Sequence, residues 1–329
     1  MFRTRKARTG IDIGSTGIKL VRGEGRAALE VVTHAGTEPW DGLDRENRTE
    51  RAGDALRELM RKQGLSRLQL GHVAVGVGWK EAALRETELP PITAAELARA
   101  LPYEARNHLE LDNMESPVLA GQVLGAAAGV GTAVLDPETG TAGTRVLMAA
   151  VPRLRRDWVV GVLARAGIEP EVVDLEPLAA LNALFAELPP DTAVDEAVGL
   201  LDLGGRHAAL HIASRRGGLL TRTVGPDAPA DPASPQEHGF RLKLSAGIEQ
   251  TITFYRGRYR QEIATIHVAG GGALAAGRLE ALQTATGKRF ELFRPLASLG
   301  AHGEIDGRQV GPEYLMACGL CRWWDGAHV

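Results

Sequence analysis

The sequence feature that most constrains the fold is a short pattern that occurs twice, at Asp12 and again at Asp202. In the first copy, an apolar run leads to Asp12 and is followed by Gly14, Ser15, Thr16 and Lys19 before the next apolar run. This order predicts a buried strand, a tight turn and an outgoing strand. Glycine lets the backbone approach a phosphate closely, and hydroxyl and ammonium groups add donors and positive charge. The turn is therefore a candidate phosphate site, although similar turns also close ordinary hairpins.

The second copy repeats this scheme with an apolar run over 197–201, then Asp202, Gly204, Gly205 and a second apolar run. Two such hairpins in one chain predict two related halves that face each other across a cleft. A carboxylate at the end of each leading strand is suited to hold Mg²⁺ through water. Asp12 and Asp202 are therefore the candidate metal-binding residues.

A third glycine-rich turn follows the apolar segment 263–268 and consists of Gly270, Gly271 and Gly272. A turn without side chains lets a flat ring or a phosphate pack against the backbone. These three residues are therefore a further candidate part of a nucleotide site.

Together, the three motifs resemble the two phosphate loops and the adenosine loop of the actin, Hsp70 and sugar kinase superfamily. Within it, the sequence resembles the PilM group of type IV pilus assembly proteins, which is similar to the cell-division protein FtsA. The likeness extends over segments 101–106, 149–152, 167–179 and 311–320. It implies an α/β fold that is bilobal and actin-like, with ribonuclease H-like repeats and an inserted small α/β subdomain.

On this resemblance, the first lobe comprises residues 1–79 and 154–190, the insert 80–153, and the second lobe 191–329. The family carries a helical subdomain after the second phosphate hairpin, and its side chains grip the ribose and adenine. Here residues 226–235 contain four prolines. A segment so rich in proline is not expected to form a helix. The second lobe is therefore predicted to be truncated, without most of that subdomain.

The resemblance implies a cytoplasmic scaffold that lies at the inner membrane through its partners. Those partners would be the short cytoplasmic tail of a PilN-like membrane protein and the pilus assembly motor ATPase. ATP and Mg²⁺ are the implied cofactors, and turnover in the group is weak or absent. The sequence itself argues against nucleic acid as a partner, because a net charge of -3 offers no basic surface. It also contains no run of the ~20 apolar residues that a membrane span needs.

The insert is the expected partner-binding region. Thr93 and Glu96 form a capping-box pattern that predicts a helix over 94–109, with a kink or break at Pro102. Segments 118–124 and 144–151 are predicted as paired strands, and the edge of such a small sheet accepts an extended peptide. From this edge and from the family's groove, the expected partner-binding residues are Tyr103, Leu119, Gln122 and Leu124. The alternative is that the insert merely covers the cleft.

Three other functions remain open at this point. An ATP-using enzyme of the sugar kinase or Hsp70 class would employ Asp12, Asp202 and Glu176, with Glu176 or Asp174 as the general base. Phosphoryl transfer also needs a positioned nucleophile, for which the sequence offers no convincing candidate, and an acid at Glu176 suits a helix start in any case. The second alternative is an FtsA-like division protein. The third is an interaction protein whose cleft is empty.

Two other patterns have simpler explanations. Cys318 and Cys321 form a Cys-x-x-Cys in the last predicted helix, away from any strand or metal-ligand partner, which favours a packing role. Arg256, Arg258 and Arg260 form a basic turn that either contacts a phosphate or an acidic partner or is simply solvated.

Overall fold

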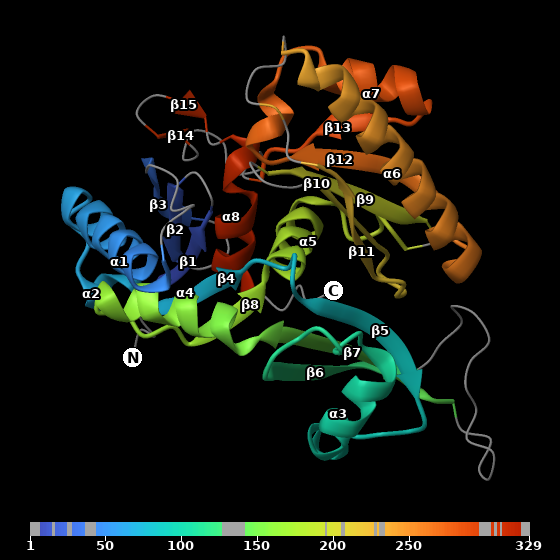
Figure 1. Ribbon diagram of the computed structural model, residues 1–329, viewed down its shortest axis with the longest axis horizontal. Coiled ribbons are helices and arrows are strands. Elements are labelled where there is room, and N and C mark those ends of the chain that lie inside the picture. The colour runs from blue at the N-terminus through green and yellow to red at the C-terminus, as the bar shows by residue number, and fades with distance from the viewer. Residues whose placement is uncertain are drawn as a thin grey trace.

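The structure is a computed structural model of the 329-residue chain. It describes residues 7–14, 17–24, 28–36, 44–126, 142–194, 196–204, 208–226, 229, 234–295, 304–305, 308–309 and 311–323. In Figure 1 the chain forms two lobes, with a smaller subdomain below the second lobe and two helices between the lobes.

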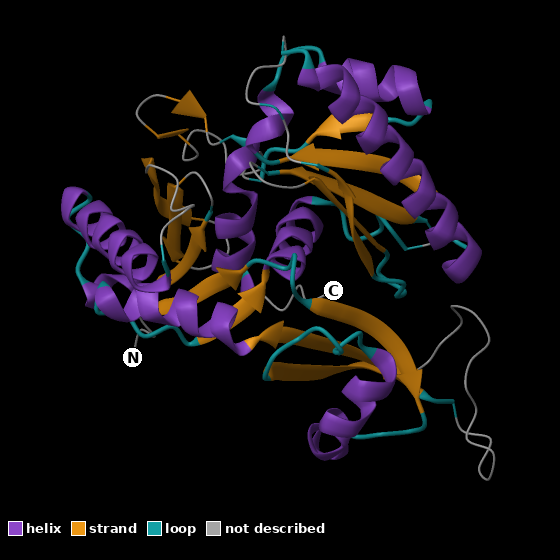
Figure 2. Cartoon of the chain, in the orientation of Figure 1, coloured by secondary structure: helices purple, strands orange, loops and turns teal. Residues whose placement is uncertain are grey.

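The first lobe is built on a five-stranded sheet in the order β3-β2-β1-β4-β8. Strands β1, β2 and β3 are antiparallel neighbours, whereas β4 and β8 run parallel to β1 and to each other. Their bounds are Ala7–Ile13, Gly17–Glu24, Ala28–Gly36, His72–Val77 and Val172–Leu175. Helices α1 (Arg45–Lys62) and α4 (Arg153–Arg165) pack on one face with the short α2 (Arg67–Leu70) nearby. Figure 2 shows these helices beside the sheet.

The second lobe repeats this topology strand for strand. Its sheet has the order β11-β10-β9-β12-β13, with three antiparallel strands followed by two parallel ones. The bounds are Leu220–Gly225, Ala208–Ala213, Ala197–Leu203, Ile263–Ala269 and Phe290–Leu292. Helices α6 (Gln236–Tyr259) and α7 (Arg278–Thr286) cover its outer face. The prediction of two related halves is therefore confirmed.

Two helices form the layer between the sheets: α5 (Glu176–Glu187) and α8 (Leu315–Cys321). They contact each other at bare backbone, because a Cβ at Gly319 would lie 1.7 Å from the carbonyl oxygen of Ala179. On the first sheet, a Cβ at Gly10 would lie 2.1 Å from the carbonyl oxygen of Ala317. Strand β9 is buried along its whole length, as expected for a strand covered on both faces.

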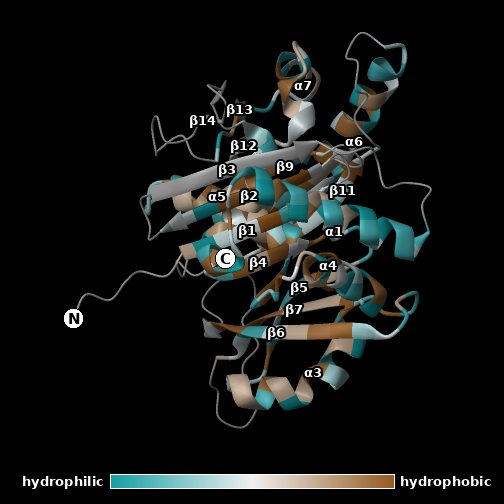
Figure 3. Cartoon of the chain, turned by 90° about the vertical axis from the view of Figure 1, so that its left-hand side faces the viewer, coloured by the Kyte–Doolittle hydropathy of each residue, from teal (hydrophilic) through white to brown (hydrophobic). Residues whose placement is uncertain are grey.

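The inserted subdomain follows β4 and is a three-stranded antiparallel sheet in the order β5-β7-β6. Its elements are β5 (Ala83–Leu89), α3 (Ala94–His108), β6 (Pro117–Ala126) and β7 (Thr144–Pro152). The capping box of Thr93 and Glu96 is present, and the helix continues through Pro102 to His108. The predicted break at Pro102 is therefore absent. Figures 1 and 3 both place α3 on the face of the small sheet that points away from the lobes.

The insert is joined to the second lobe by a buried carboxylate on β5. Glu86 accepts hydrogen bonds from the backbone N–H groups of Gly218 (3.0 Å) and Leu219 (2.9 Å), in the turn between β10 and β11. It also forms an ion pair of 3.1 Å with Arg145 on β7. Arg145 in turn donates to the carbonyl oxygen of Arg216 at 2.8 Å. The insert is thus held against the second lobe by side chains of two of its strands.

The remaining described elements are short. Strands β14 (Glu304–Ile305) and β15 (Arg308–Gln309) form a hairpin, and 3-10 helices run over Gly271–Leu274 and Pro312–Tyr314. Ten residues, 226–235, connect β11 to α6. The truncation of the second lobe stays a prediction.

Candidate functional site

The two aspartate-led hairpins come from different lobes, and their charged side chains are close enough to interact. Asp12 and Asp202 are 6% and 7% exposed. The positive charge of Lys19 interacts with both carboxylates. Lys19 Nζ donates to Asp12 Oδ2 at 3.1 Å. Burial alone would lower the pKa of Lys19, but the charge of Asp12, followed by those of Asp202 and Glu313, raises it. The two hairpins therefore lie close to each other.

Gly14 and Gly270 both lie close to an aspartate of the two hairpins. A Cβ at Gly14 would meet Lys19 Nζ at 3.4 Å and Asp12 Oδ1 at 3.8 Å. Gly270, with φ +86, lies so close to the second hairpin that a Cβ would be 2.6 Å from Asp202 Oδ1. Gly270 is therefore required both by its positive φ and by its contact with the second hairpin.

Other predicted residues lie around this point or outside the described chain. Gly204 follows β9 directly, and Gly271 and Gly272 begin the 3-10 helix that follows Gly270. Ser15, Thr16 and Gly205 lie outside the residues that the structure describes. Their predicted contact with phosphate therefore stays a prediction.

Glu176, at the start of α5, is the third predicted acid of the cleft. Burial, followed by the charges of Asp12 and Asp202, raises its pKa to about 8, although Lys19 and Arg155 oppose the shift. Burial and the charge of Asp12 likewise raise the pKa of Asp202 to about 7, against the effect of Lys19. A cluster of like charges in a buried place shifts pKa values in this direction.

Sequence reasoning missed a fourth acid, Glu313, which lies in the 3-10 helix before α8. Its charge acts on Lys19, and its Oε2 is buried without a hydrogen-bond partner in the described part of the chain. The only sequence signal is an acid after Gly311 and Pro312, which a helix start would also explain. Its place in the cleft depends on how α8 crosses between the lobes.

The donor set of the cleft fits a hydrated divalent cation and a phosphate. Carboxylate oxygens are the ligands that Mg²⁺ prefers, usually with several waters retained. Within the described residues, no three acidic, histidine or cysteine side chains converge as direct metal ligands. The binding of Mg²⁺ by Asp12 and Asp202 through water stays a prediction.

The nucleoside side of the cleft fits less well. Next to the Gly270–Gly272 turn, the buried Arg278 donates to the carbonyl oxygen of Gly272 at 2.7 Å and to both carboxylate oxygens of Glu237. Its guanidinium carbon lies 5.1 Å from the ring centre of Phe240. The ion pair of Arg278 and Glu237 thus lies beside the glycine turn, where the sequence predicted that the adenosine would bind.

The predicted partner-binding residues are distributed over both sides of the insert. Tyr103 on α3 is 70% exposed. Leu119 packs with the cluster beneath α3, whereas Leu124 packs against the core between the lobes. Gln122 is exposed, and β6 pairs only with β7 among the described strands. Leu119, Gln122 and Leu124 lie along β6 and do not share one face, whereas Tyr103 lies on α3.

The other two sequence patterns resolve differently. Cys318 and Cys321 are free and buried in α8, and burial raises the pKa of the Cys318 thiol well above its usual value. In the basic turn, Arg258 lies over the ring of Tyr259, Arg260 caps α6 in a left-handed conformation, and Arg256 lines a cavity considered below.

The repeated sheets, the two central helices and the acidic cleft define the actin-like fold, so the predicted fold class is confirmed. The particular similarity is to a chain of the PilM-PilN type IV pilus biogenesis complex. The TM-score is 0.78 at 20% identity, covering 96% of this chain and 98% of that one. At this identity the similarity establishes the fold.

Two further solved structures match less well. One is the ethanolamine utilization protein EutJ from Carboxydothermus hydrogenoformans, with a TM-score of 0.48, 16% identity and coverage of 96% and 89%. The other is a Bacteroides thetaiotaomicron protein with an actin-like ATPase fold and unknown function, at 0.49, 10%, and 90% and 95%. No protein-family model and no curated protein matches the sequence.

None of the helices in the described part of the chain combines the length and apolar surface that a membrane crossing requires.

Proposed function

We propose that this protein is an actin-like scaffold of a type IV pilus assembly machinery and binds the cytoplasmic tail of a PilN-like membrane protein. The observation that carries the proposal is the similarity to the PilM-PilN complex chain, which includes nearly all of both chains at a TM-score of 0.78. A match over the whole length takes in the inserted subdomain, the part that distinguishes one actin-like protein from another. The protein would work in the cytoplasm, at the inner membrane through its partner.

The free edge of β6 supports a specific mode of binding. An extended peptide can add to an unpaired strand edge, because its backbone N–H and C=O groups complete the ladder. The middle of β6 is exposed, with Ala120, Gly121 and Gln122 open to solvent. Tyr103 on α3 is 70% exposed and is proposed to give the bound tail a further apolar contact. In this proposal the motor ATPase is a second partner.

The cleft is proposed to bind Mg²⁺ and the phosphates of a nucleotide, which would make the scaffold responsive to nucleotide. Asp12 and Asp202 would hold the hydrated metal ion, while Lys19 and the backbone at Gly14 and Gly204 would contact phosphate. Bound Mg²⁺ would neutralise the phosphate charge. The unpaired carboxylate of Glu313 would add to the negative field that attracts the cation.

A synthetic peptide with the N-terminal sequence of the PilN-like protein tests the partner. Fluorescence anisotropy should give saturable binding to the full chain. Methyl groups on the peptide's backbone nitrogens should block binding at every second position, because alternate N–H groups of an added strand face β6. Tyr103→Ala should weaken binding, and Leu242→Ala, which trims another exposed apolar side chain on α6, should not. Tolerance of methylation at all positions would exclude strand addition at β6.

Calorimetric titration with Mg-ATP tests the cleft separately. The double variant Asp12→Asn, Lys19→Met removes both charges of a buried pair. Because Asp202 and Glu176 then lose the opposing charge of Lys19, circular dichroism must first show that the variant is folded. Mg-ATP should bind the wild type and not the double variant. If the wild type binds no Mg-ATP, the nucleotide part of the proposal is wrong, whereas the peptide result still decides the scaffold.

A further inference from the structure

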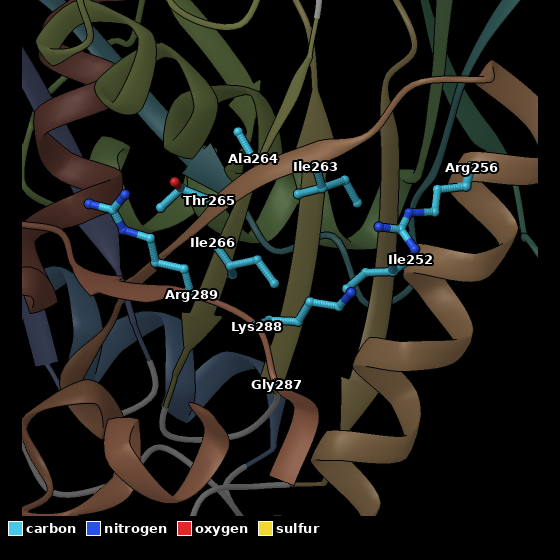
Figure 4. A pocket seen from close by; sticks show the side chains of 9 residues that line it. All are labelled: Ile252, Arg256, Ile263, Ala264, Thr265, Ile266, Gly287, Lys288 and Arg289. Carbon is cyan, nitrogen blue, oxygen red and sulfur yellow. The ribbon is translucent and has the colours of Figure 1, made fainter. Parts of the chain in front are cut away.

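A cavity of ≈ 180 Å³ opens on the second lobe between α6, the start of β12 and the chain that enters β13. It belongs to elements other than the phosphate hairpins and β6, so it is separate from the sites considered above. Nine residues line it: Ile252, Arg256, Ile263, Ala264, Thr265, Ile266, Gly287, Lys288 and Arg289. Figure 4 shows their arrangement.

The lining carries three cations and no acid. Arg256 pairs with Glu262 and Arg289 with Glu291, both acids lying outside the lining. For Lys288, no ion pair or ammonium hydrogen bond is found among the described residues. In Figure 4 the side chains of Lys288 and Arg256 extend toward each other from different elements. Two converging cations with one neutralising acid leave the cavity positively charged.

Arg256 also has a donor that no protein group accepts. Its Nε is buried and has no hydrogen-bond partner in the described chain. A buried N–H without an acceptor is costly, so this atom is available to donate to a ligand that enters the cavity. The negative end of α6 explains why arginines collect there, but it does not explain Lys288 on another element.

The floor of the cavity is apolar, with Ile252 and Ile266 buried and Ile263 partly buried. The cavity is reachable from the end of the sheet, because β13 first pairs with β12 at Ile266 and leaves residues 263–265 extending beyond it. An inorganic phosphate would pair with the cations, but it has no apolar group to cover the isoleucine side chains. A carboxylate on a short methylene stem would satisfy both parts of the cavity.

We propose that this cavity binds an acidic side chain, glutamate or aspartate, that a protein partner presents on an extended segment. The carboxylate accepts from Arg256 Nε and Lys288 Nζ, while its stem packs on the isoleucine floor. The site is independent of the proposed PilN-like tail, which adds to β6.

The probe is the acetylated, amidated peptide Val-Glu-Val-Glu-Val, titrated into ¹⁵N-labelled full chain and followed by NMR. The expected result is a concentration-dependent shift of the amide signals of Thr265, Lys288 and Arg289 and of the Arg256 Nε–H signal. The matched Val-Gln-Val-Gln-Val peptide should shift none of them. Lys288→Gln should weaken the binding of the acidic peptide about tenfold, since it removes one charge-assisted hydrogen bond.

The control variant is Lys243→Gln, which removes one positive charge from an exposed position of the same helix, α6, and should leave the binding unchanged. If inorganic phosphate shifts the same signals at lower concentration than the peptide, the ligand class is wrong. If the glutamine peptide binds equally well, or if no signal of the cavity moves with either peptide, the proposal is overturned.

Discussion

Replacing Glu86 by alanine should destabilise the protein strongly, because this side chain joins the insert to the second lobe. The carboxylate is 8% exposed and accepts from two backbone N–H groups and from Arg145. The residues that it bridges lie more than a hundred positions apart in the sequence. No neighbouring side chain in the described residues replaces these three contacts.

The expected loss follows from what the substitution leaves behind. Removing one member of a buried ion pair typically costs about 3–5 kcal/mol, because the other charge stays buried without a partner. Arg145 is 16% exposed in its side chain and keeps one hydrogen bond, to the carbonyl of Arg216. The Gly218 and Leu219 N–H groups lose their acceptor at roughly 1–3 kcal/mol each when water cannot reach them. Since these costs overlap, we expect a total loss of about 3–5 kcal/mol.

Urea unfolding followed by circular dichroism measures this loss. The matched control is Glu81→Ala, which removes a bidentate partner of Arg155 in an exposed ion pair. A pair of that kind contributes about 0–1 kcal/mol. A Glu86→Ala variant within 1 kcal/mol of wild type, or no less stable than the control, would refute the reasoning.

Three further predictions concern packing, ionisation and reactivity. Gly319→Ala should lower the free energy of unfolding by at least about 1–3 kcal/mol, because the new Cβ would lie 1.7 Å from the carbonyl oxygen of Ala179. The control is Gly257→Ala on α6, where a Cβ would enter open space. In the same urea assay it should be neutral or stabilising by up to about 1 kcal/mol. Glu176 has a pKa of about 8 in the folded protein and near 4.5 in the unfolded chain. Between these two pH values the unfolded state binds fewer protons than the folded state, so stability should fall as the pH rises from 5 to 8. Glu176→Gln should match wild type at pH 5 and melt at a higher temperature at pH 8; an equal decline in both proteins would contradict the pKa. Cys318, a buried thiol with a raised pKa, should react with a disulfide reagent only on unfolding, and rapid labelling of the native protein would show that α8 is placed wrongly.

The insert shows how far local pattern reaches. Thr93 and Glu96 are three residues apart, and their capping box could be read directly because both partners lie in one turn of helix. The sequence predicted a kink or a break at Pro102 in the same way; the break is absent, since the helix continues to His108. Packing of Leu97, Leu101 and Ala105 against the small sheet outweighs the missing backbone donor.

The sequence alone determined the two aspartate-led hairpins and the proline-rich connection, since each depends on neighbours in the chain and on turn chemistry. Only the tertiary structure decided that Glu313 enters the cleft, that Glu86 meets the turn before β11, and that Lys288 approaches Arg256. Those meetings depend on how separate elements cross in space, and a single sequence contains no local signal for the crossing. The sequence thus predicted the chemical groups of each half, whereas it did not predict the contacts between separate elements.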